Sequence, residues 1–492
     1  MKRSKRIFCI LVLALLVRLL IAGFTCPISG DGITYIGFAR SLMEGEYAIP
    51  FFGYRCILYP LMIIFFSPVS PDIVAAGQAA SVTMGVMTVL LVYLFGRRLF
   101  DERVAETAAL LGAVQPYMCR YSGDVLTETT YTFFFFLAAF LGLGAVKRGR
   151  VRDFLLAGFA VAIAYFAKPE GLAFLVFLWL WILAGLKNAR FGRRLLLVGV
   201  SSLFVGLLLV PQMYGYYRLT GRVTVSEKFA GSVRLGQVED AEEMFYDPEG
   251  ASSRDYTPPF FQVSYYAHAV VTFFELFVKL LESGPVIVAL FAIGLLFRRG
   301  RSFSREERYI ASLLVFFFVG FSFIRPSKRF LIPLLPFFLY WSAMGLNAIS
   351  DAAGRRWRGA VSAAVLVLML VVTFRQARRV DYRWRWSPEE RAGLWLKENS
   401  PPGPRVISRK GWVAFYAGGE RLNLPLTYDE LLMSSSENGA DYFVFRESRL
   451  KRKRPEMIDR ISPADMEIIH TERDGEDSIL IYKFRKDQVI FL

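Results

Sequence analysis

The chain has 492 residues, of which 54% are hydrophobic and 21% charged, with 45 Phe and 23 Tyr. A soluble chain carries about 25% charged residues and seldom contains apolar runs of about 20 residues. Such runs recur here from residue 7 to residue 374, and the composition excludes a disordered, collagen-like or disulfide-scaffold chain. Two histidines argue against a histidine-based zinc site or catalytic triad. We therefore expect an α-helical polytopic membrane protein.

Eleven apolar runs predict transmembrane helices within a membrane part that covers residues 1–375. The first run follows a basic segment, as in a signal peptide, but no small-residue cleavage site follows, so we interpret it as a retained helix. Several runs are shorter than the ~20 residues of a straight span and must extend into their flanks. The predicted spans are residues 7–24, 73–95, 107–119, 126–146, 153–167, 171–186, 195–214, 284–297, 309–324, 329–349 and 359–374.

The basic residues predict the orientation of these spans. Six alternate loops hold three to five Lys and Arg each, whereas the short loops 120–125 and 168–170 hold one each. Because basic loops stay in the cytoplasm, the N-terminus is expected there, and eleven crossings leave the C-terminus outside. Since +14 of the net charge of +16 lies in residues 1–375, the basic excess reports topology and not nucleic-acid binding. The six loops are residues 2–6, 96–106, 147–152, 187–194, 298–308 and 350–358.

Two long loops, residues 25–72 and 215–283, are predicted on the outer side, where function tends to lie. Within the second, residues 260–281 are apolar enough to cross the membrane. They contain Glu275 and Lys279, however, and each charge would cost ~2.5–3.5 kcal/mol near a helix centre. We expect an amphipathic helix on the outer surface; a crossing would instead place the C-terminus inside.

Residues 376–492 hold 21 Lys and Arg against 19 Asp and Glu, a balance typical of a soluble domain. We expect an extracytoplasmic α/β domain there. Ser387, followed by Pro388 and two glutamates, predicts the start of one helix. Residues 427–437 predict a second helix, which closes near Gly439. Strands are predicted at residues 405–409, 441–446, 466–471 and 478–484.

The first outer loop carries a carboxylate, a cation and two phenols. If it turns helical after residue 30, Asp31 and Tyr35 share one face at i,i+4, and Arg55 and Tyr59 repeat that spacing. The simpler alternative is a solvated loop in which Asp31 caps a helix.

The start of the fourth span carries further acids. If a helix begins at Gly123, Asp124 and Glu128 fall on one face of it, with Thr127 beside them, at or just under the membrane surface. A carboxylate there is a candidate functional residue because exposing it to lipid is costly; the alternative is an acid that complements the helix dipole.

Cations gather on the same predicted side, against the positive-inside trend. Lys168 lies in a Lys-Pro-Glu-Gly turn, which the Pro and Gly explain without any function, and Arg325, Lys328 and Arg329 precede a Leu- and Pro-rich helix. With the acids, they predict a site where an anionic headgroup meets a general base at the lipid–water boundary. Arg18, inside the first span, is expected to pair with an acid in the bundle.

This set of residues resembles the GT-C superfamily of membrane glycosyltransferases, which use polyprenyl-phosphate sugars. It is most similar to the bacterial branch of protein mannosyltransferases and lipid A aminoarabinose transferases. An acid followed four residues later by Tyr is that branch's hallmark in the first outer loop. The matching positions are Asp31 with Tyr35, Arg55 with Tyr59-Pro60, Asp124 with Thr127-Glu128, Lys168-Pro169, and Arg329 with the run ending at Pro336. Tyr54-Arg55 replaces the Glu-Lys of aminoarabinose transferases, and the sequence lacks a Trp-Trp-Asp motif like that of oligosaccharyltransferases.

The resemblance implies an inverting glycosyltransferase in the cytoplasmic (inner) membrane. Asp31 would take a proton from an acceptor hydroxyl, whose oxygen attacks the anomeric carbon. Cations among Arg55, Lys168 and Arg329 would hold the departing polyprenyl phosphate.

Other members of the set have supporting roles in this scheme. Asp124 and Glu128 would orient the acceptor or sugar, or hold a divalent metal if one is needed, and Tyr35 and Tyr59 would line the pocket. The implied partners are a polyprenyl-phosphate sugar donor, a lipid, glycan or protein acceptor, and membrane lipids. The alternatives are a transporter or flippase for a lipid-linked or anionic substrate, and a non-catalytic scaffold. Charges gathered on one face, without an inverted repeat, favour the enzyme.

Overall fold

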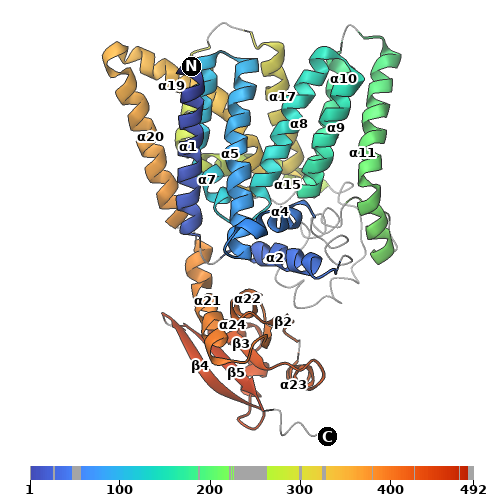
Figure 1. Ribbon diagram of the computed structural model, residues 1–492, viewed down its shortest axis with the longest axis vertical. Coiled ribbons are helices and arrows are strands. Elements are labelled where there is room, and N and C mark those ends of the chain that lie inside the picture. Colours follow the sequence, from blue (N-terminus) through green and yellow to red (C-terminus); the bar gives the residue numbers. More distant parts are fainter. Residues whose placement is uncertain are drawn as a thin grey trace. The chain divides into compact units, whose positions relative to one another are not determined.

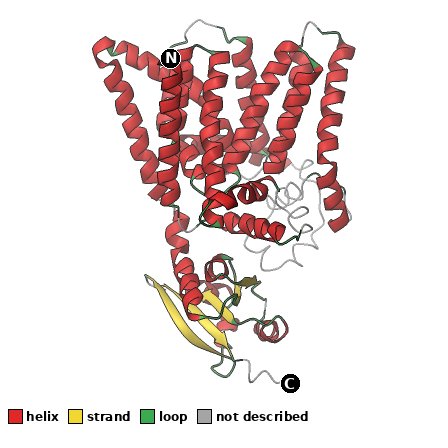
Figure 2. Cartoon of the chain, in the orientation of Figure 1, coloured by secondary structure: helices red, strands yellow, loops and turns green. Residues whose placement is uncertain are grey.

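The computed structural model describes most of the chain in two compact units. Residues 1–25 and 35–378 form the helical unit, and residues 26–34 and 379–492 form the sheet unit. The strands all gather in the sheet unit (Figure 2). The described residues are 2–25, 28–46, 57–186, 189–220, 223, 225, 263–298, 302–323, 328–378, 381–425, 427–475 and 477–485.

Each of the eleven predicted apolar runs overlaps a described helix of the helical unit. Many of them run roughly parallel to one another (Figure 1). Six are long and apolar enough to cross a membrane, which supports an integral membrane protein, whereas eleven crossings stay a prediction. The helices are α1 Lys2–Gly23, α5 Ile73–Leu99, α6 Glu102–Val114, α8 Glu128–Arg148, α9 Val151–Ala167, α10 Ala173–Gly185, α11 Phe191–Thr220, α16 Pro285–Leu296, α17 Arg305–Ser322, α19 Leu335–Ala352 and α20 Gly354–Arg378.

Small residues and aromatic rings hold these helices together. A Cβ on Gly294 of α16 would fall 1.9 Å from the carbonyl oxygen of Trp341 on α19, so glycine lets the two backbones touch. Between α8 and α17, the rings of Phe135 and Phe317 meet edge to face with centroids 4.8 Å apart. Such contacts replace the hydrophobic driving force that lipid cannot supply between apolar helices.

Short elements connect the long helices. Figure 1 shows α4 and the adjoining part of α2 lying across one end of the upright helices. The short elements are α2 Gly30–Met43, α4 Leu58–Phe66, η1 Ser67–Val69, α7 Pro116–Ser122, η2 Pro169–Leu172, α15 Val263–Ser283, α18 Lys328–Leu331 and η4 Ile332–Leu334.

The helix predicted at residues 260–281 is confirmed as α15. It meets α16 at 105°, so the two do not form one straight span. Lys279 Nζ lies 3.5 Å from Glu275 Oε2, and the two charges therefore pair along the helix. That α15 lies on the membrane surface stays a prediction.

The span predicted at residues 107–119 is wrong as one helix, because the chain breaks at Gln115 between α6 and α7. Pro116 has no N–H, so the carbonyl of Gly112 loses its helical donor. Gln115 caps the new helix, since its Oε1 accepts a hydrogen bond from Met118 N at 2.6 Å.

Arg18 supplies the donors that this break removes. Fully buried on α1, it donates to Gly112 O at 3.2 Å, to Ala113 O at 3.0 Å and to Ser122 Oγ at 3.2 Å. The expectation that Arg18 pairs with an acid is therefore wrong: backbone carbonyls left over by a helix break satisfy the guanidinium instead. Gly85 makes the space, as a Cβ there would lie 2.7 Å from Arg18 Nε.

The sheet unit contains a five-stranded sheet in the order β2-β1-β3-β5-β4. Strand β1 (Arg405–Ser408) pairs in parallel with β2 (Glu420–Leu422) and β3 (Tyr442–Arg446). Strand β5 (Asp477–Phe484) pairs antiparallel with β3 and with β4 (Met466–Asp474). The helices of the unit are α21 Asp381–Asn399, α22 Trp412–Ala417, α23 Tyr428–Glu437, α24 Glu447–Lys453 and α25 Pro455–Asp459.

Period-two alternation on β3 builds two cores, one on each face of the sheet. Phe443 and Phe445 belong to the cluster that includes Leu431 of α23. Tyr442 and Val444 belong to the cluster that includes α21 and α22. The predicted α/β architecture is thus confirmed, with its four strands and second helix.

The predicted start of the first tail helix at Ser387 is wrong, because α21 begins at Asp381 and runs through Pro388. A proline removes only its own N–H, so a helix that continues past it loses one hydrogen bond. The short β2, α22, α24 and α25 have no counterpart among the predicted elements.

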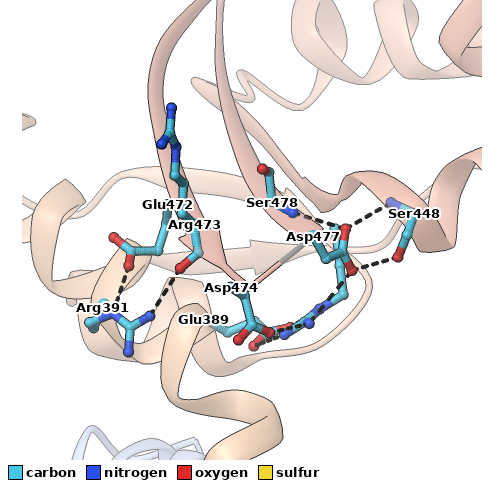
Figure 3. A network of polar contacts seen from close by, with 9 residues as sticks. Glu389, Arg391, Ser448, Glu472, Arg473, Asp474, Asp477 and Ser478 are labelled. Atoms are coloured by element: carbon cyan, nitrogen blue, oxygen red, sulfur yellow. Dashed lines mark hydrogen bonds and ion pairs between the residues drawn. The ribbon is translucent and has the colours of Figure 1, made fainter.

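A polar network ties α21 to the β4–β5 hairpin (Figure 3). Arg446 Nη2 lies 3.1 Å from Glu389 Oε2, and Arg446 Nη1 lies 2.5 Å from Asp474 Oδ2. Asp477 accepts hydrogen bonds from Ser448 Oγ at 2.5 Å and from Ser448 N at 3.0 Å. The network leaves the half-buried arginine fully engaged by carboxylates.

Candidate functional site

Helix α2 begins with the residues that carry the predicted acid. Gly32 N donates to Ser29 Oγ at 3.0 Å, so Ser29 makes a capping contact at the start of this helix. Asp31 and Tyr35 lie on this helix four residues apart, as the spacing predicts. Asp31 therefore stands one turn before Tyr35 on the same face.

The sheet unit anchors the chain just before this helix. Ile28 N donates to Tyr416 Oη at 3.1 Å, and Trp412 Nε1 donates to Ile28 O at 2.9 Å. Gly30 lies against the indole, since a Cβ there would come within 3.0 Å of the Trp412 ring. Both backbone groups of one residue are thus fixed by side chains of α22.

Cations of the sheet unit lie near Asp31. Burial lowers the pKa of Lys410, and the neighbouring Arg409, Arg449 and Arg421 lower it further, whereas Asp31 raises it. Lys410, in the β1–α22 turn, therefore lies close enough to interact with the carboxylate of Asp31.

In the helical unit, Glu128 forms the centre of a buried charge cluster. Its Oε1 accepts a hydrogen bond from Lys168 Nζ at 2.8 Å and pairs with Arg329 Nε. The Glu128 side chain is 1% exposed and that of Lys168 is 10% exposed, whereas Arg329 is 36% exposed. The alternative that Lys168 simply faces water is wrong, because Glu128 draws it inward. Among these three residues the two cations outnumber the one carboxylate, and such an excess suits an anion.

Glu128 Oε2 and Tyr131 Oη are buried without a hydrogen-bond partner in the described part of the chain. Lys168 Nζ lies 6.0 Å from the centroid of the Tyr131 ring. Sequence reasoning missed Tyr131, although its i,i+3 spacing from Glu128 on α8 places it on the same face. Burying a polar atom without a hydrogen-bond partner costs free energy, so these two atoms mark a place where a ligand would supply the missing partners.

Tyr35 and Tyr59 form an aromatic pair beside this cluster. Their centroids are 5.4 Å apart at an interplanar angle of 74°. Tyr35 Oη lies 3.5 Å from Thr127 Oγ1, next to Glu128 in the chain. Tyr59, fully buried, donates to Gly77 O at 2.8 Å, so it packs as a fixed wall.

Asp124 does not share a helical face with Glu128, and that expectation is wrong. Residues 123–127 form a turn between α7 and α8, and α8 begins at Glu128 itself. Asp124 is buried, and its Oδ1 accepts a hydrogen bond from Val125 N at 2.8 Å. Glu128, in the first turn of α8, still complements the positive helix end.

The remaining predicted cations are distributed differently. Lys328 Nζ lies 2.5 Å from Glu282 Oε2 on α15, where both side chains are partly exposed. Arg55 and Arg325 lie outside the described residues. The candidate site in the helical unit therefore rests on Glu128, Lys168 and Arg329.

A divalent metal does not fit around Asp124 and Glu128 as the structure describes them. The described residues contain no group of three or more His, Cys, Asp or Glu that could hold an ion. Glu128 Oε1, moreover, is already shared by two cations, which would repel a metal.

Sequence comparison links part of the helical unit to a known family. Residues 55–214 match the sequence model of the family described as dolichyl-phosphate-mannose-protein mannosyltransferase. Among curated proteins, none matches the sequence significantly.

Solved structures extend the likeness to the whole chain. ArnT from Cupriavidus metallidurans in the apo state superposes with a TM-score of 0.68 at 12% identity, covering 98% of both chains. The chain has the GT-C fold. The same ArnT bound to undecaprenyl phosphate gives 0.67 at 12% identity, covering 96% of this chain and 97% of that one. AglB from Archaeoglobus fulgidus, in complex with an inhibitory peptide and a dolichol-phosphate, gives 0.58 at 15% identity and covers 89% of this GT-C chain and 69% of AglB. The predicted resemblance to the GT-C superfamily is confirmed.

Proposed function

We propose that this GT-C protein is an inverting glycosyltransferase. It moves a sugar from a polyprenyl-phosphate donor to a hydroxyl group of a lipid, glycan or protein, at the outer face of the cytoplasmic membrane. The observation that carries the proposal is the buried carboxylate of Glu128 that holds Lys168 and Arg329 together with a net positive charge. The GT-C fold and the undecaprenyl phosphate in a solved relative support a phosphate-linked lipid as the ligand.

The proposed reaction needs one base and a set of cations. Asp31 takes the proton of the acceptor hydroxyl as the acceptor oxygen bonds to the anomeric carbon from the face opposite the phosphate. The bond from that carbon to the phosphate oxygen breaks, and its electron pair leaves with the polyprenyl phosphate. The configuration at the carbon inverts. A phosphate leaving group needs little protonation, so no second acid is required.

Lys168 and Arg329 hold the departing phosphate in this scheme, and Glu128 positions them. Arg329 is the more exposed of the two, and a guanidinium group suits two phosphate oxygens. Lys168, which is largely buried, stabilises developing charge more than a solvated cation would. Arg55, Arg325 and Lys328 are further proposed phosphate contacts.

The aromatic pair and the remaining acid support the substrate in this proposal. Tyr35, one helical turn after Asp31, reaches the Thr127 hydroxyl beside Glu128, which connects the base-bearing helix to the start of α8. Tyr59 forms the wall behind Tyr35, and Asp124 is proposed to orient the acceptor or sugar.

Donor turnover tests the function. Purified protein in nanodiscs is given a panel of polyprenyl-phosphate monosaccharides and a crude envelope extract as acceptor, and free polyprenyl phosphate is quantified. We expect release by the wild type and a loss of at least about 10²-fold in Asp31→Asn, the size of a general-base effect. Asp72→Asn is the matched control, because Asp72 is an exposed N-cap that Asn replaces without loss.

Two results would contradict the proposal. Equal turnover by Asp31→Asn and wild type would remove the base assignment. Movement of an intact donor across the membrane without release of polyprenyl phosphate would identify a flippase instead.

A further inference from the structure

A cavity of about 930 Å³ lies at the end of the helical unit away from Glu128. Its wall includes the last turns of α8 and α10 and the first turns of α11 and α17. Because α8 begins at Glu128 and has 21 residues, the cavity is about 30 Å from the charge cluster. It is therefore separate from the candidate active site.

Among the described residues, five cations and no carboxylate line this cavity: Lys147, Arg148, Arg193, Arg305 and Arg308. Lys147 is neutralised by Glu306 at 2.5 Å and Arg148 by Asp153 at 2.7 Å. Within the described part of the chain, the other three arginines form no ion pair. The cavity thus keeps three positive charges without counter-charges.

Two of these arginines are held in place by helix ends. Arg305 Nη2 donates to Gly185 O at 2.7 Å, at the end of α10, and Arg193 Nη2 donates to Gly149 O at 3.2 Å, after α8. A guanidinium has five N–H donors, so each contact leaves most of them for another acceptor. The arginines are pre-positioned for an anion because the helix ends fix them.

The rest of the wall is apolar and partly open. Leu180 on α10 is 51% exposed and Phe303 is 41% exposed, and Trp181, Leu186 and Leu197 continue the surface. Trp181 Nε1 donates to Ser312 Oγ at 2.9 Å, and its ring, which lines the cavity, also meets the ring of Tyr309 with centroids 5.1 Å apart. A soluble anion would leave this surface uncovered, whereas a lipid would cover it.

We propose that this cavity binds an anionic phospholipid of the surrounding bilayer. The phosphodiester contacts Arg193, Arg305 and Arg308, and an acyl chain runs along Leu180 and Trp181. Basic pockets between membrane helices, at the level where the apolar segments end, have the chemistry that anionic headgroups need. The proposal is independent of the glycosyltransferase function.

Quenching of Trp181 by brominated lipid tests the site. Full-length protein is placed in phosphatidylcholine nanodiscs that contain dibrominated phosphatidylglycerol or, separately, dibrominated phosphatidylcholine. The difference between wild type and Trp181→Phe isolates the signal of this residue. We expect phosphatidylglycerol to half-saturate that signal at a roughly hundredfold lower fraction of the lipid, because each of the three arginines contributes about fivefold.

Variants separate the site from general surface charge. Arg305→Gln/Arg308→Gln should abolish the preference, and so should Ala311→Glu, which adds a carboxylate to the wall and keeps the contact to Gly185. Arg355→Gln/Arg356→Gln, which removes two exposed cations outside the cavity, should keep it.

Four results would overturn the proposal. They are equal quenching by both lipids, loss of the preference in Arg355→Gln/Arg356→Gln, its loss on addition of inorganic phosphate, and displacement of phosphatidylglycerol by an equal fraction of undecaprenyl phosphate. The third would indicate a soluble-anion site, and the fourth would assign the cavity to the carrier lipid.

Discussion

The ion pair between Glu128 and Lys168 permits a quantitative test of the candidate site. At 2.8 Å the Coulomb attraction is about 6 kcal/mol for an effective dielectric constant of about 20. Desolvation offsets most of that, but removing one buried partner leaves the other uncompensated, at a cost of about 3–5 kcal/mol. We therefore expect Glu128→Gln to destabilise the helical unit by about that amount, and Lys168→Met by less, because Arg329 still pairs with Glu128. The double variant should cost less than the sum, with a coupling of about 2–3 kcal/mol.

The coupling is measured by detergent-induced unfolding of the reconstituted protein, followed by tryptophan fluorescence. The matched control is the cycle of Glu275→Gln with Lys279→Met, an ion pair at 3.5 Å in which Glu275 is 50% exposed. That pair should couple by less than about 0.5 kcal/mol. A coupling for Glu128 and Lys168 no larger than the control would refute the reasoning that burial makes this pair strong.

Three further predictions concern other parts of the chain. Arg18→Met should cost about 3 kcal/mol in the free energy of unfolding, because buried carbonyls lose charged donors. Trp412→Phe should lower donor turnover about fivefold, because the helix that carries Asp31 loses the anchoring bond to Ile28 O, worth about 1 kcal/mol. Burial alone would raise the pKa of Asp477, but hydrogen bonds from Ser448 and Ser478 and the nearby Arg446 hold it below 3.8. Its stabilisation should therefore be present above about pH 4 and be lost as the pH falls through the folded-state pKa.

Each of these has a control. Arg6→Met removes an arginine whose side chain is 66% exposed and should change stability by less than about 0.5 kcal/mol. Trp395→Phe alters an indole of the sheet unit that stacks on His470 and should leave turnover unchanged. Stability is measured by circular dichroism as the pH is lowered, and Asp477→Asn should lose less stability than the wild type. If the two stability curves run parallel, Asp477 is not the group whose protonation lowers the stability.

Much of the fold could be predicted from the sequence because it depends on local composition. An apolar run must leave water whichever neighbours it has, so each of the eleven runs overlaps a described helix. Strand β3 and its neighbours follow from period-two alternation in the same way. The start of α21 was predicted at Ser387 because a proline such as Pro388 is typical of the first turn of a helix. In the structure the helix already begins at Asp381 and continues past Pro388.

The sequence predicted which residues belong to the candidate site, but it did not predict which residues pair with them. Asp31 and Tyr35 share a face because i,i+4 spacing is a property of one helix. Glu128, in contrast, pairs with residues 40 and 201 positions away, and Arg18 donates to carbonyls 94 and 95 positions away. Spacing along a chain carries no information about such pairs, because they form only where separate helices pack. The sequence determined which groups are costly to bury, and the packing of the helices decided which neighbours satisfy them.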